Sequence, residues 1–321
     1  MNRISLRRAL APAAVAASLV FTLAACGGGQ TSDAEGGEGA SGSVTVDGSS
    51  TVFPLSDAAA ELLAEENPNI NVTVASSGTG GGFKNFCAGK TDISDASRPI
   101  KDDEEVPVCE EAGVEFTELQ VATDALTVVV NKDLAVDCLT TEQLNKIWAP
   151  ESQGKITNWN QVDPSFPDQE IALFGPGTDS GTFDYFTDEV NGEEGASRSD
   201  YEASEDDNVI VEGVANSEGA TGYFGYTYYE ENADKLKAVK IDSGEGCVEP
   251  SVETAQSGDY TPLARPLFIY VSNKSYTEKP QAKEYVDFYI ENLADIAEAA
   301  EYIPLNDEQF SATKNTLEGI K

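Results

Sequence analysis

The sequence predicts an α/β fold, and three observations support this prediction. From Val44 onward, short apolar segments alternate with amphipathic ones, which is the pattern of strands followed by helices. The loops after several of the apolar segments are rich in glycine, serine and threonine. The chain has 321 residues, of which 40% are hydrophobic, enough for one large or two medium domains with buried cores.

The first elements repeat one local design of strand, polar loop and helix. SVTV (43–46) predicts a strand, and AAAELLAEE predicts a helix that Ser56 is expected to cap and that ends at Asn67-Pro68. INVTV (70–74) predicts the second strand, and FKNFCAG (83–89) the second helix.

The remaining elements continue the alternation. ALTVVVN, IALF, ATGYFGYTYY and PLARPLFIYV predict strands at 125–131, 171–174, 220–229 and 262–271. TTEQLNKIW, TFDYFTDEV and KPQAKEYVDFYIENL predict helices at 140–148, 182–190 and 279–293. No internal repeat interrupts this order.

The composition excludes several functions. The net charge is −37, with 57 acidic against 20 basic residues, which argues against nucleic-acid binding because phosphate backbones attract basic faces. The chain has no histidine, so Ser-His-Asp catalysis, Cys-His catalysis and histidine-ligated zinc are excluded. We therefore expect no catalytic residue, no metal and no cofactor.

The N-terminus predicts export. Residues 1–25 combine arginines with an apolar, small-residue segment, as signal peptides do. Leu23-Ala24-Ala25-Cys26 resembles a bacterial lipobox, which predicts a lipid on Cys26 and anchoring to the outer face of the cell membrane, at the cell surface or in the periplasm. Residues 26–43 follow as a flexible linker of glycine, serine and acidic residues.

Three loops share the features of an oxyanion site. DGSSTVFPL, SSGTGGG and GPGTDSGTF each follow a predicted strand and precede a predicted helix. The first N–H groups of a helix lack partners within it and carry the positive end of its dipole, while glycine allows a ligand close to the backbone. The P-loop pattern GxxxxGK[ST] is absent, so a nucleotide is disfavoured.

The chain resembles the substrate-binding lipoproteins of high-affinity phosphate ABC importers, within the periplasmic binding protein superfamily. The resemblance covers residues 44–321 and rests on these motifs in order: DGSSTVFPL, SSGTGGGFKNFCAGKTDISDASRPI, TDALTVVVN, LFGPGTDSGTFDYF and RPLFIYV. It implies a two-lobed Venus-flytrap fold of type 2 with the ligand in the cleft, lobe 1 being residues 44–122 plus 265–321 and lobe 2 residues 123–264. It also implies a monomer that delivers inorganic phosphate to the membrane subunits of an ABC permease.

The resemblance also implies the ligand-binding residues. Ser50, Thr51 and the Val52 amide match the first phosphate-binding loop, and Thr79 matches the hydroxyl of the second. Ser180, Gly181 and Thr182 match the SGT of the loop from lobe 2.

Two departures from the family pattern concern charge. Family members often carry an arginine shortly before SGT, where this chain has Pro176; we hypothesise that Arg98 supplies the cation, the alternative being a salt bridge to a nearby acid. Ser97 stands where many members place an aspartate that selects protonated phosphate over sulfate. Asp95 and Asp179 are candidate substitutes, with Asp179 also a candidate helix cap.

Four cysteines follow Cys26: Cys87, Cys109, Cys138 and Cys247. An even number in an exported chain predicts two disulfides, with three pairings open. We favour Cys87–Cys109 and Cys138–Cys247, because each pair then closes a loop within one predicted lobe.

Three other functions remain to be weighed. The same fold could bind another oxyanion, such as sulfate, molybdate or an organic phosphate, an alternative that Ser97 keeps open. A secreted phosphatase is opposed by the lack of histidine. A structural lipoprotein would leave the three oxyanion-type loops without a role.

Overall fold

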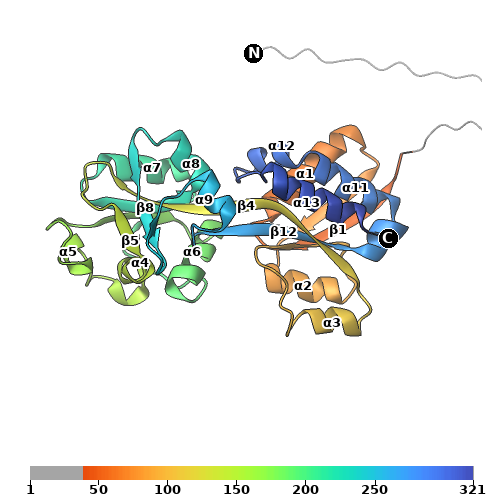
Figure 1. Cartoon of the computed structure of the whole chain (residues 1–321), viewed down its shortest axis with the longest axis horizontal. Coiled ribbons are helices and arrows are strands. Elements are labelled where there is room, and N and C mark those ends of the chain that lie inside the picture. Colours follow the sequence, from red (N-terminus) through yellow and green to blue (C-terminus); the bar gives the residue numbers. More distant parts are fainter. Residues whose placement is uncertain (1–38, 321) are drawn as a thin grey trace, which may run out of the picture. The chain divides into compact units, whose positions relative to one another are not determined.

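The computed structural model describes residues 39–320, in which strands and helices alternate and confirm the predicted α/β class (Figure 1). The predicted signal peptide, Cys26 and most of the predicted linker lie outside these residues. The strands are Gly42–Gly48 (β1), Ile70–Ala75 (β2), Ile93–Ala96 (β3), Phe116–Asn131 (β4), Cys138–Thr140 (β5), Ala172–Pro176 (β6), Glu202–Ser204 (β7), Ala220–Gly225 (β8), Leu236–Ala238 (β9), Lys240–Asp242 (β10), Cys247–Val248 (β11) and Ala264–Ser272 (β12).

The helices lie between and after these strands. They are Phe53–Glu66 (α1), Thr79–Cys87 (α2), Val106–Glu111 (α3), Thr141–Trp148 (α4), Trp159–Val162 (α5), Gly181–Asn191 (α6), Asp207–Asn216 (α7), Tyr226–Glu231 (α8), Val252–Ser257 (α9), Asn273–Glu278 (α10), Pro280–Glu291 (α11), Leu293–Ala299 (α12) and Asp307–Glu318 (α13), with a 3₁₀ turn at Pro150–Ser152 (η1). Among residues 39–320, no helix is both long and apolar enough to span a bilayer.

One sheet runs through the described residues in the order β2-β1-β3-β12-β4-β8-β6-β7, with β9 also paired to β4. The outer pairs β1–β2, β1–β3, β6–β7 and β6–β8 are parallel. The central pair, β4 and β12, is antiparallel and the longest, and it brings Asp124 opposite Arg265. A separate three-stranded sheet has the order β11-β10-β5.

Two large apolar cores lie along this sheet. Ala122 and Leu267 belong to the first, with α1, α11 and α12; Leu126 and Leu263 belong to the second, with α4 and α6. Along β4 and β12, the side chains pass from the first core to the second near Asp124. The predicted lobe boundaries remain a proposal. Because β4 and β12 run through both halves, the described residues form one compact unit.

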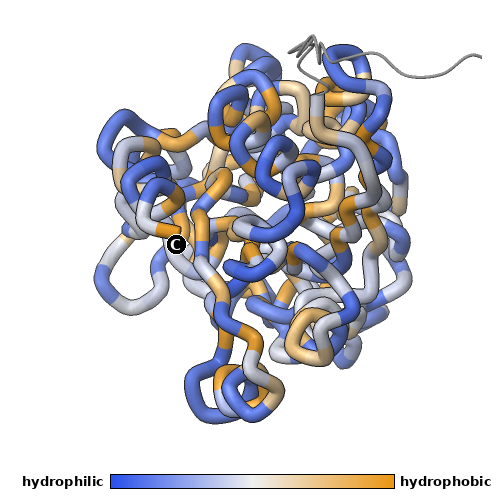
Figure 2. The backbone as a smooth tube through the Cα atoms, turned by 90° about the vertical axis from the view of Figure 1, so that its right-hand side faces the viewer, coloured by the Kyte–Doolittle hydropathy of each residue, from blue (hydrophilic) through white to orange (hydrophobic). Residues whose placement is uncertain are grey.

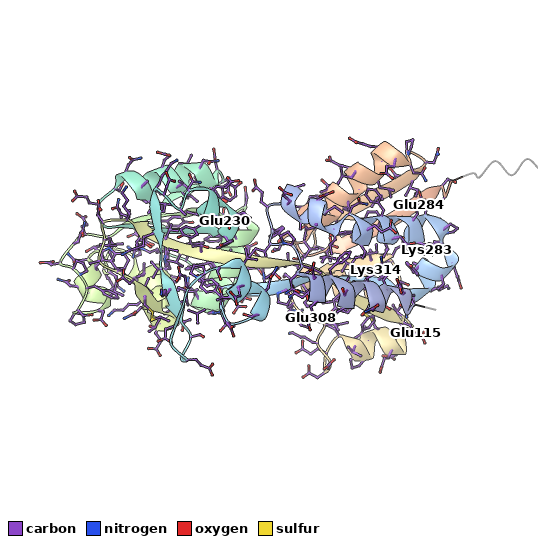
Figure 3. The ribbon with its side chains drawn as sticks, turned by 45° about the horizontal axis from the view of Figure 1, so that its top comes forward. Glu115, Glu230, Lys283, Glu284, Glu308 and Lys314 are labelled. Carbon is purple, nitrogen blue, oxygen red and sulfur yellow. A yellow bond between two sulfur atoms is a disulfide. The ribbon has the colours of Figure 1, made fainter. Side chains whose placement is uncertain are left out.

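Helices cover both faces of each half of the sheet. In the first half, α1, α11, α12 and α13 lie on one face and α2 and α3 on the other (Figure 1). The tube coloured by hydropathy places most apolar stretches inside and hydrophilic ones at the outer turns (Figure 2). The exposed Glu115, Glu230 and Glu308 show how acidic side chains extend from this surface (Figure 3).

Two local predictions were wrong. Helix α1 begins at Phe53 with Val52 as its N-cap residue; Ser56 lies inside it, fully buried, and donates a hydrogen bond to Asp95 instead of capping. The strand predicted over 220–229 ends at Gly225, and Tyr226–Glu231 form α8. Tyr228 and Tyr229 pack against the core cluster of Val129 and Phe224, so tertiary packing overrides the strand propensity of the tyrosines.

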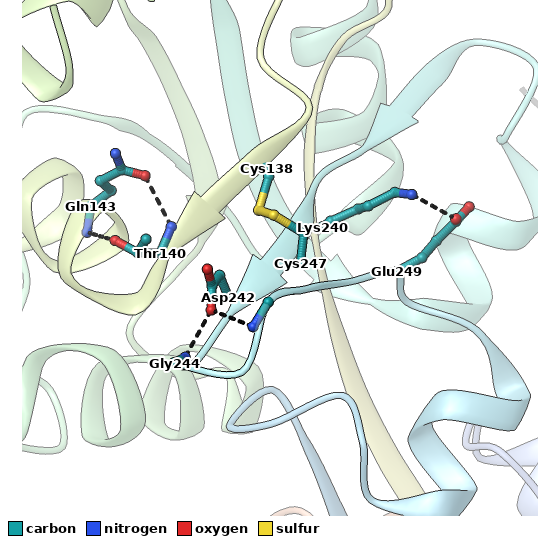
Figure 4. The surroundings of a disulfide bond; sticks show 9 residues. Cys138, Thr140, Gln143, Lys240, Asp242, Gly244, Cys247 and Glu249 are labelled. Carbon is teal, nitrogen blue, oxygen red and sulfur yellow. Dashed lines mark hydrogen bonds and ion pairs between the residues drawn. A yellow bond between two sulfur atoms is a disulfide. The ribbon is translucent and has the colours of Figure 1, made fainter. Parts of the chain in front are cut away.

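The favoured disulfide pairing is present in the structure. Cys87 bonds to Cys109 and Cys138 bonds to Cys247. The second bond joins β5 to β11 in the three-stranded sheet (Figure 4). Next to it, Thr140 caps α4 through a capping box with Gln143, which confirms the predicted helix start.

Candidate functional site

A cavity of about 430 Å³ contains most of the predicted ligand-binding residues. It is lined by residues associated with both halves of the sheet, namely Ser49, Ser50, Thr51, Ser77, Gly78, Thr79, Gly80, Gly81, Ser97, Arg98, Gly181, Asp184, Tyr185, Asp188, Glu189, Glu194 and Arg265. Six of the nine predicted residues line it: Ser50, Thr51, Thr79, Ser97, Arg98 and Gly181.

The other three predicted residues are adjacent. The Val52 side chain is buried in the first core. The Ser180 side chain caps α6 by accepting a hydrogen bond from the Thr182 N–H at 3.2 Å. Thr182 lines a smaller neighbouring cavity together with Asp124. Asp179 was expected as a helix cap, but Ser180 holds that position.

The first loop is shaped by a close contact at Gly48. Gly48 has a φ of +153°, and a Cβ there would lie 2.1 Å from the Asp95 carbonyl oxygen, so only glycine fits. The Ser49 N–H donates to the same carbonyl at 3.0 Å. The Ser49 hydroxyl accepts from the Thr51 N–H at 3.2 Å. These bonds hold Ser50 and Thr51 against the cavity, immediately before α1.

The second loop is tied to Ser97. Gly78 has a φ of +79° and directly precedes α2, a left-handed conformation that glycine adopts easily. Thr79 Oγ1 lies 3.1 Å from Ser97 Oγ and accepts from the Ser97 N–H at 3.2 Å. Two hydroxyls and the N-terminus of α2 therefore meet at one wall of the cavity.

The third loop faces the first. Gly181 begins α6, and a Cβ there would lie 3.4 Å from Thr51 Oγ1 and 3.7 Å from Ser50 Oγ. The N-termini of α1 and α6 thus approach each other across the cavity. Because the N-terminus of a helix carries positive partial charge, the two helix ends together favour an anion in this cavity.

Arg98 both lines the cavity and forms an ion pair. Its Nη1 and Nη2 donate to the two carboxylate oxygens of Glu105 at 2.9 and 2.8 Å, and Nη1 also donates to the Pro99 carbonyl oxygen at 3.0 Å. Burial opposes the charge on Glu105, but the hydrogen bond from Arg98 and other contacts outweigh it and leave the pKa of Glu105 below its usual range. The salt-bridge alternative for Arg98 is therefore present in the structure.

The sequence analysis did not single out Arg265, which lies in the cavity. Its Nε is 3.3 Å from Asp124 Oδ2, its Nη2 donates to Thr51 Oγ1 at 2.9 Å, and its Cζ lies 3.4 Å from the centre of the Tyr185 ring. The signal available was an arginine inside an otherwise apolar strand, PLARPLF, because a charge in such a strand usually has a partner or a ligand.

The candidate carboxylate substitutes are elsewhere. Asp95 is fully buried beneath the first loop, accepts from Ser56 Oγ at 2.8 Å, and does not line the cavity. Asp179 is exposed and also does not line it. The carboxylates that do line the cavity are Asp184, Asp188, Glu189 and Glu194, in and just after α6.

A larger cavity of about 890 Å³ lies between α9, α13 and the central strands. None of the predicted ligand-binding residues lines it. Within residues 39–320, no group of three or more His, Cys, Asp or Glu residues is arranged to hold a metal ion. The 430 Å³ cavity combines hydroxyls, helix N-termini and the side chains of Arg98 and Arg265.

Known proteins resemble this chain in sequence and structure. A profile of the PBP superfamily domain matches residues 33–292. Protein SphX of Synechococcus elongatus is 48% identical, covering 87% of this chain and 82% of SphX. The phosphate-binding protein PstS of Staphylococcus saprophyticus is 41% identical, covering 96% of this chain and 92% of PstS.

Two solved structures extend this comparison. The crystal structure of a possible phosphate binding protein from Planctomyces limnophilus has a TM-score of 0.82 and 46% identity, covering 87% of this chain and 98% of that one. An ABC-type phosphate transport receptor from Vibrio cholerae has a TM-score of 0.63 and 25% identity, covering 81% and 99%. These matches show that the chain belongs to the PBP superfamily, within its family of PstS phosphate-binding proteins.

Proposed function

We propose that the protein binds inorganic phosphate in the 430 Å³ cavity and delivers it to an ABC-type phosphate permease. The observation that carries this proposal is the approach of Gly181 to Thr51, which brings the N-termini of α6 and α1 together around one polar cavity. Oxyanions are favoured where helix N–H groups and hydroxyls converge. The names of the PstS relatives and of the Vibrio receptor support phosphate as the oxyanion.

The proposed contacts come from all three loops. Ser50, Thr51 and the Val52 amide would donate from the first loop, Thr79 and Ser97 from the second wall, and Ser180, Gly181 and Thr182 from the start of α6. Because these hydroxyl and amide donors carry no net charge, binding would depend on short, well-aligned hydrogen bonds. Hinge closure would bring the α6 donors onto the ligand. Arg98 is retained as a proposed contact at the cavity edge.

A second ligand class is favoured by one specific observation. Ser97 stands where many family members place the selective aspartate, and neither the buried Asp95 nor the exposed Asp179 lines the cavity. Sulfate, molybdate or an organic phosphate is therefore the alternative ligand. The carboxylates of α6 oppose a fully deprotonated anion such as sulfate, which favours phosphate.

The remaining features of the proposal concern the chain as a whole. It works as an exported monomer, anchored by a lipid on Cys26 to the outer face of the cell membrane, with residues 26–43 as a tether. It binds without catalysing a reaction. Lobe 1, residues 44–122 plus 265–321, and lobe 2, residues 123–264, are proposed as the closing halves.

The test is a calorimetric titration of the purified protein, stripped of bound ligand, with phosphate and then sulfate. Tight one-to-one phosphate binding with no sulfate heat is the expected result. Equal binding of both ions would replace phosphate with a broader oxyanion specificity. Binding of neither ion would reject the proposed function.

A further inference from the structure

We propose that Arg265 is the principal cationic contact of the bound phosphate and that it connects the ligand to both halves of the protein. This inference rests on the proposed function and assigns a role that the sequence analysis gave to Arg98. It depends on which hydrogen bonds and ion pairs the guanidinium groups of Arg98 and Arg265 form in the cavity that both line.

Three contacts from three elements hold the Arg265 side chain. Asp124 on the neighbouring strand β4 pairs with Nε at 3.3 Å. Thr51, just before α1, accepts from Nη2 at 2.9 Å. The Tyr185 ring of α6 lies against the guanidinium, 3.4 Å from Cζ. Because a guanidinium is planar and can stack on an aromatic ring, these contacts fix its orientation before any ligand arrives.

The engaged atoms leave donors for a ligand. A guanidinium has five N–H donors, and among residues 39–320 no hydrogen bond uses Nη1 of Arg265. The side chain is 19% exposed, and it lines the cavity. An arginine with a fixed plane and free Nη donors matches the oxygens of a phosphate.

Unlike Arg265, Arg98 uses both of its Nη nitrogens in an ion pair within the protein. Both of its Nη nitrogens bind the Glu105 carboxylate at 2.8–2.9 Å, so that carboxylate occupies the forked edge that a phosphate would use. Its side chain is also 35% exposed, so water screens its charge more. For phosphate to bind the Arg98 fork, the bidentate ion pair would have to break, whereas Arg265 requires no such exchange.

The counter-ion of Arg265 is placed so that it does not meet the ligand. Asp124 is 5% exposed and lines the neighbouring cavity with Thr182, not the 430 Å³ cavity. Its carboxylate accepts from Nε, and no hydrogen bond joins it to either Nη nitrogen. Burial raises the pKa of Asp124, and the charge and hydrogen bond of Arg265 oppose this rise.

Through its three contacts, the Arg265 side chain touches both halves of the protein. Thr51 and α1 belong with the first core, Tyr185 with the second, and Arg265 lies on a strand that runs through both. A phosphate on Arg265 would therefore contact a side chain that is already bound to Thr51, just before α1, and that lies on the Tyr185 ring of α6. Arg265 is thus suited to couple binding to closure.

The first experiment compares Arg265→Gln and Arg265→Lys with Arg98→Gln, which removes the other guanidinium that lines the cavity, using calorimetric titration with inorganic phosphate. Loss of a charged hydrogen-bond donor weakens binding by about 10- to 150-fold, and we expect this for Arg265→Gln. Arg265→Lys keeps the charge but loses the fork, so its loss should be smaller. Arg98→Gln removes the proposed contact at the cavity edge and should weaken binding less than Arg265→Gln does, because both Nη nitrogens of Arg98 already donate to Glu105.

A second measurement follows phosphate binding in the wild-type protein and needs substitutions only to assign signals. Residues 39–320 contain three arginines, Arg98, Arg198 and Arg265, whose guanidinium NMR signals can be assigned with single lysine variants. Phosphate added to the wild-type protein should shift the Arg265 signal most and leave that of Arg198 unchanged, because Arg198 is buried against Asp200. This result would support the inference even if Arg265→Gln failed to fold.

Two outcomes would overturn the inference. If Arg265→Gln bound phosphate like the wild type, or if the largest NMR shift fell on Arg98, the cation would be misassigned while the proposed function stood. If the wild-type protein bound no phosphate, both the proposed function and this inference would fall.

Discussion

Gly181 and Thr51 face each other across the cavity: a Cβ on Gly181 would lie 3.4 Å from the Thr51 hydroxyl oxygen. The two residues are the first residue of α6 and the second residue before α1. Their closeness brings the N-termini of α1 and α6 to the same cavity.

Gly181→Ala is therefore expected to weaken phosphate binding by about tenfold, because a methyl group would occupy the space in which a ligand meets both loops. Alanine at the first position of a helix is well tolerated, so the melting temperature should stay unchanged or rise. Gly225→Ala is the control, since a Cβ there makes only ordinary contacts at 3.9 Å. Calorimetry showing equal losses for both variants would contradict the role of Gly181.

Ser97→Asp is expected to sharpen the choice of ligand. A carboxylate beside Thr79 Oγ1, now 3.1 Å from Ser97 Oγ, would accept the proton of phosphate and repel sulfate. Sulfate binding, if present in the wild type, should fall at least about tenfold relative to phosphate. Competition of the two ions, measured by calorimetry in wild type and variant, tests this. An unchanged ratio would show that position 97 does not contact the ligand.

Phosphate affinity should depend only weakly on salt. The net charge of −37 repels anions at long range, but salt screens such fields beyond roughly 10 Å. Binding must then come from short contacts inside the cavity. We expect the dissociation constant to change by less than about fivefold between low and high ionic strength. A steep loss of affinity with added salt would indicate long-range steering instead.

Asp95→Asn should remove a pH dependence of stability. Burial raises the pKa of Asp95 to about 7 from 3.8, although the hydrogen bond from Ser56 opposes this. The folded state therefore binds a proton more tightly than the unfolded state, and the free energy of unfolding falls as pH rises from about 4 to about 7. The upper limit of the loss is about 4 kcal/mol, at 1.36 kcal/mol per pH unit.

The side-chain amide introduced by Asp95→Asn cannot ionise but can still accept a hydrogen bond from the Ser56 hydroxyl. The variant should lose less stability than the wild type between pH 5 and pH 8, as measured by urea denaturation. Ser56→Ala is the matched variant, since it removes the hydrogen bond and keeps the ionisable group. If wild type and Asp95→Asn showed the same slope with pH, Asp95 would not carry the effect.

The two disulfides should contribute unequally to stability. Cys138–Cys247 spans 109 residues and Cys87–Cys109 spans 22. Loop-closure entropy predicts losses of about 5 and about 3 kcal/mol on removal. Denaturant unfolding of the two paired alanine variants measures both. Phosphate binding should persist in each, because neither disulfide lines the cavity; a larger loss for the shorter loop would point to native-state effects.

Much of the fold could be predicted because its signals are local. Each signal extends over only a few residues. The structure has a helix start at Thr140, which forms a capping box with Gln143, and a helix end at Asn67, before Pro68. The wrong predictions also rested on local signals, but contacts with distant residues overrode them. Ser56 was predicted to cap a helix, whereas its hydroxyl donates to Asp95, 39 residues away. The tyrosines after Gly225 were predicted to extend a strand, whereas they lie in α8 and pack against a core cluster.

Local patterns in the chain were sufficient to predict the α/β class, the three glycine- and hydroxyl-rich loops before helices, and the absence of histidine chemistry. They were not sufficient to predict which side chains share the cavity, because that depends on contacts between distant parts of the chain. Arg265 and Thr51 are 214 positions apart and form a 2.9 Å hydrogen bond, while Arg98 is paired with Glu105 and Asp95 lies outside the cavity. Loop and helix preferences depend on neighbouring residues, but the partner of a charged side chain depends on where antiparallel β4 and β12 place it.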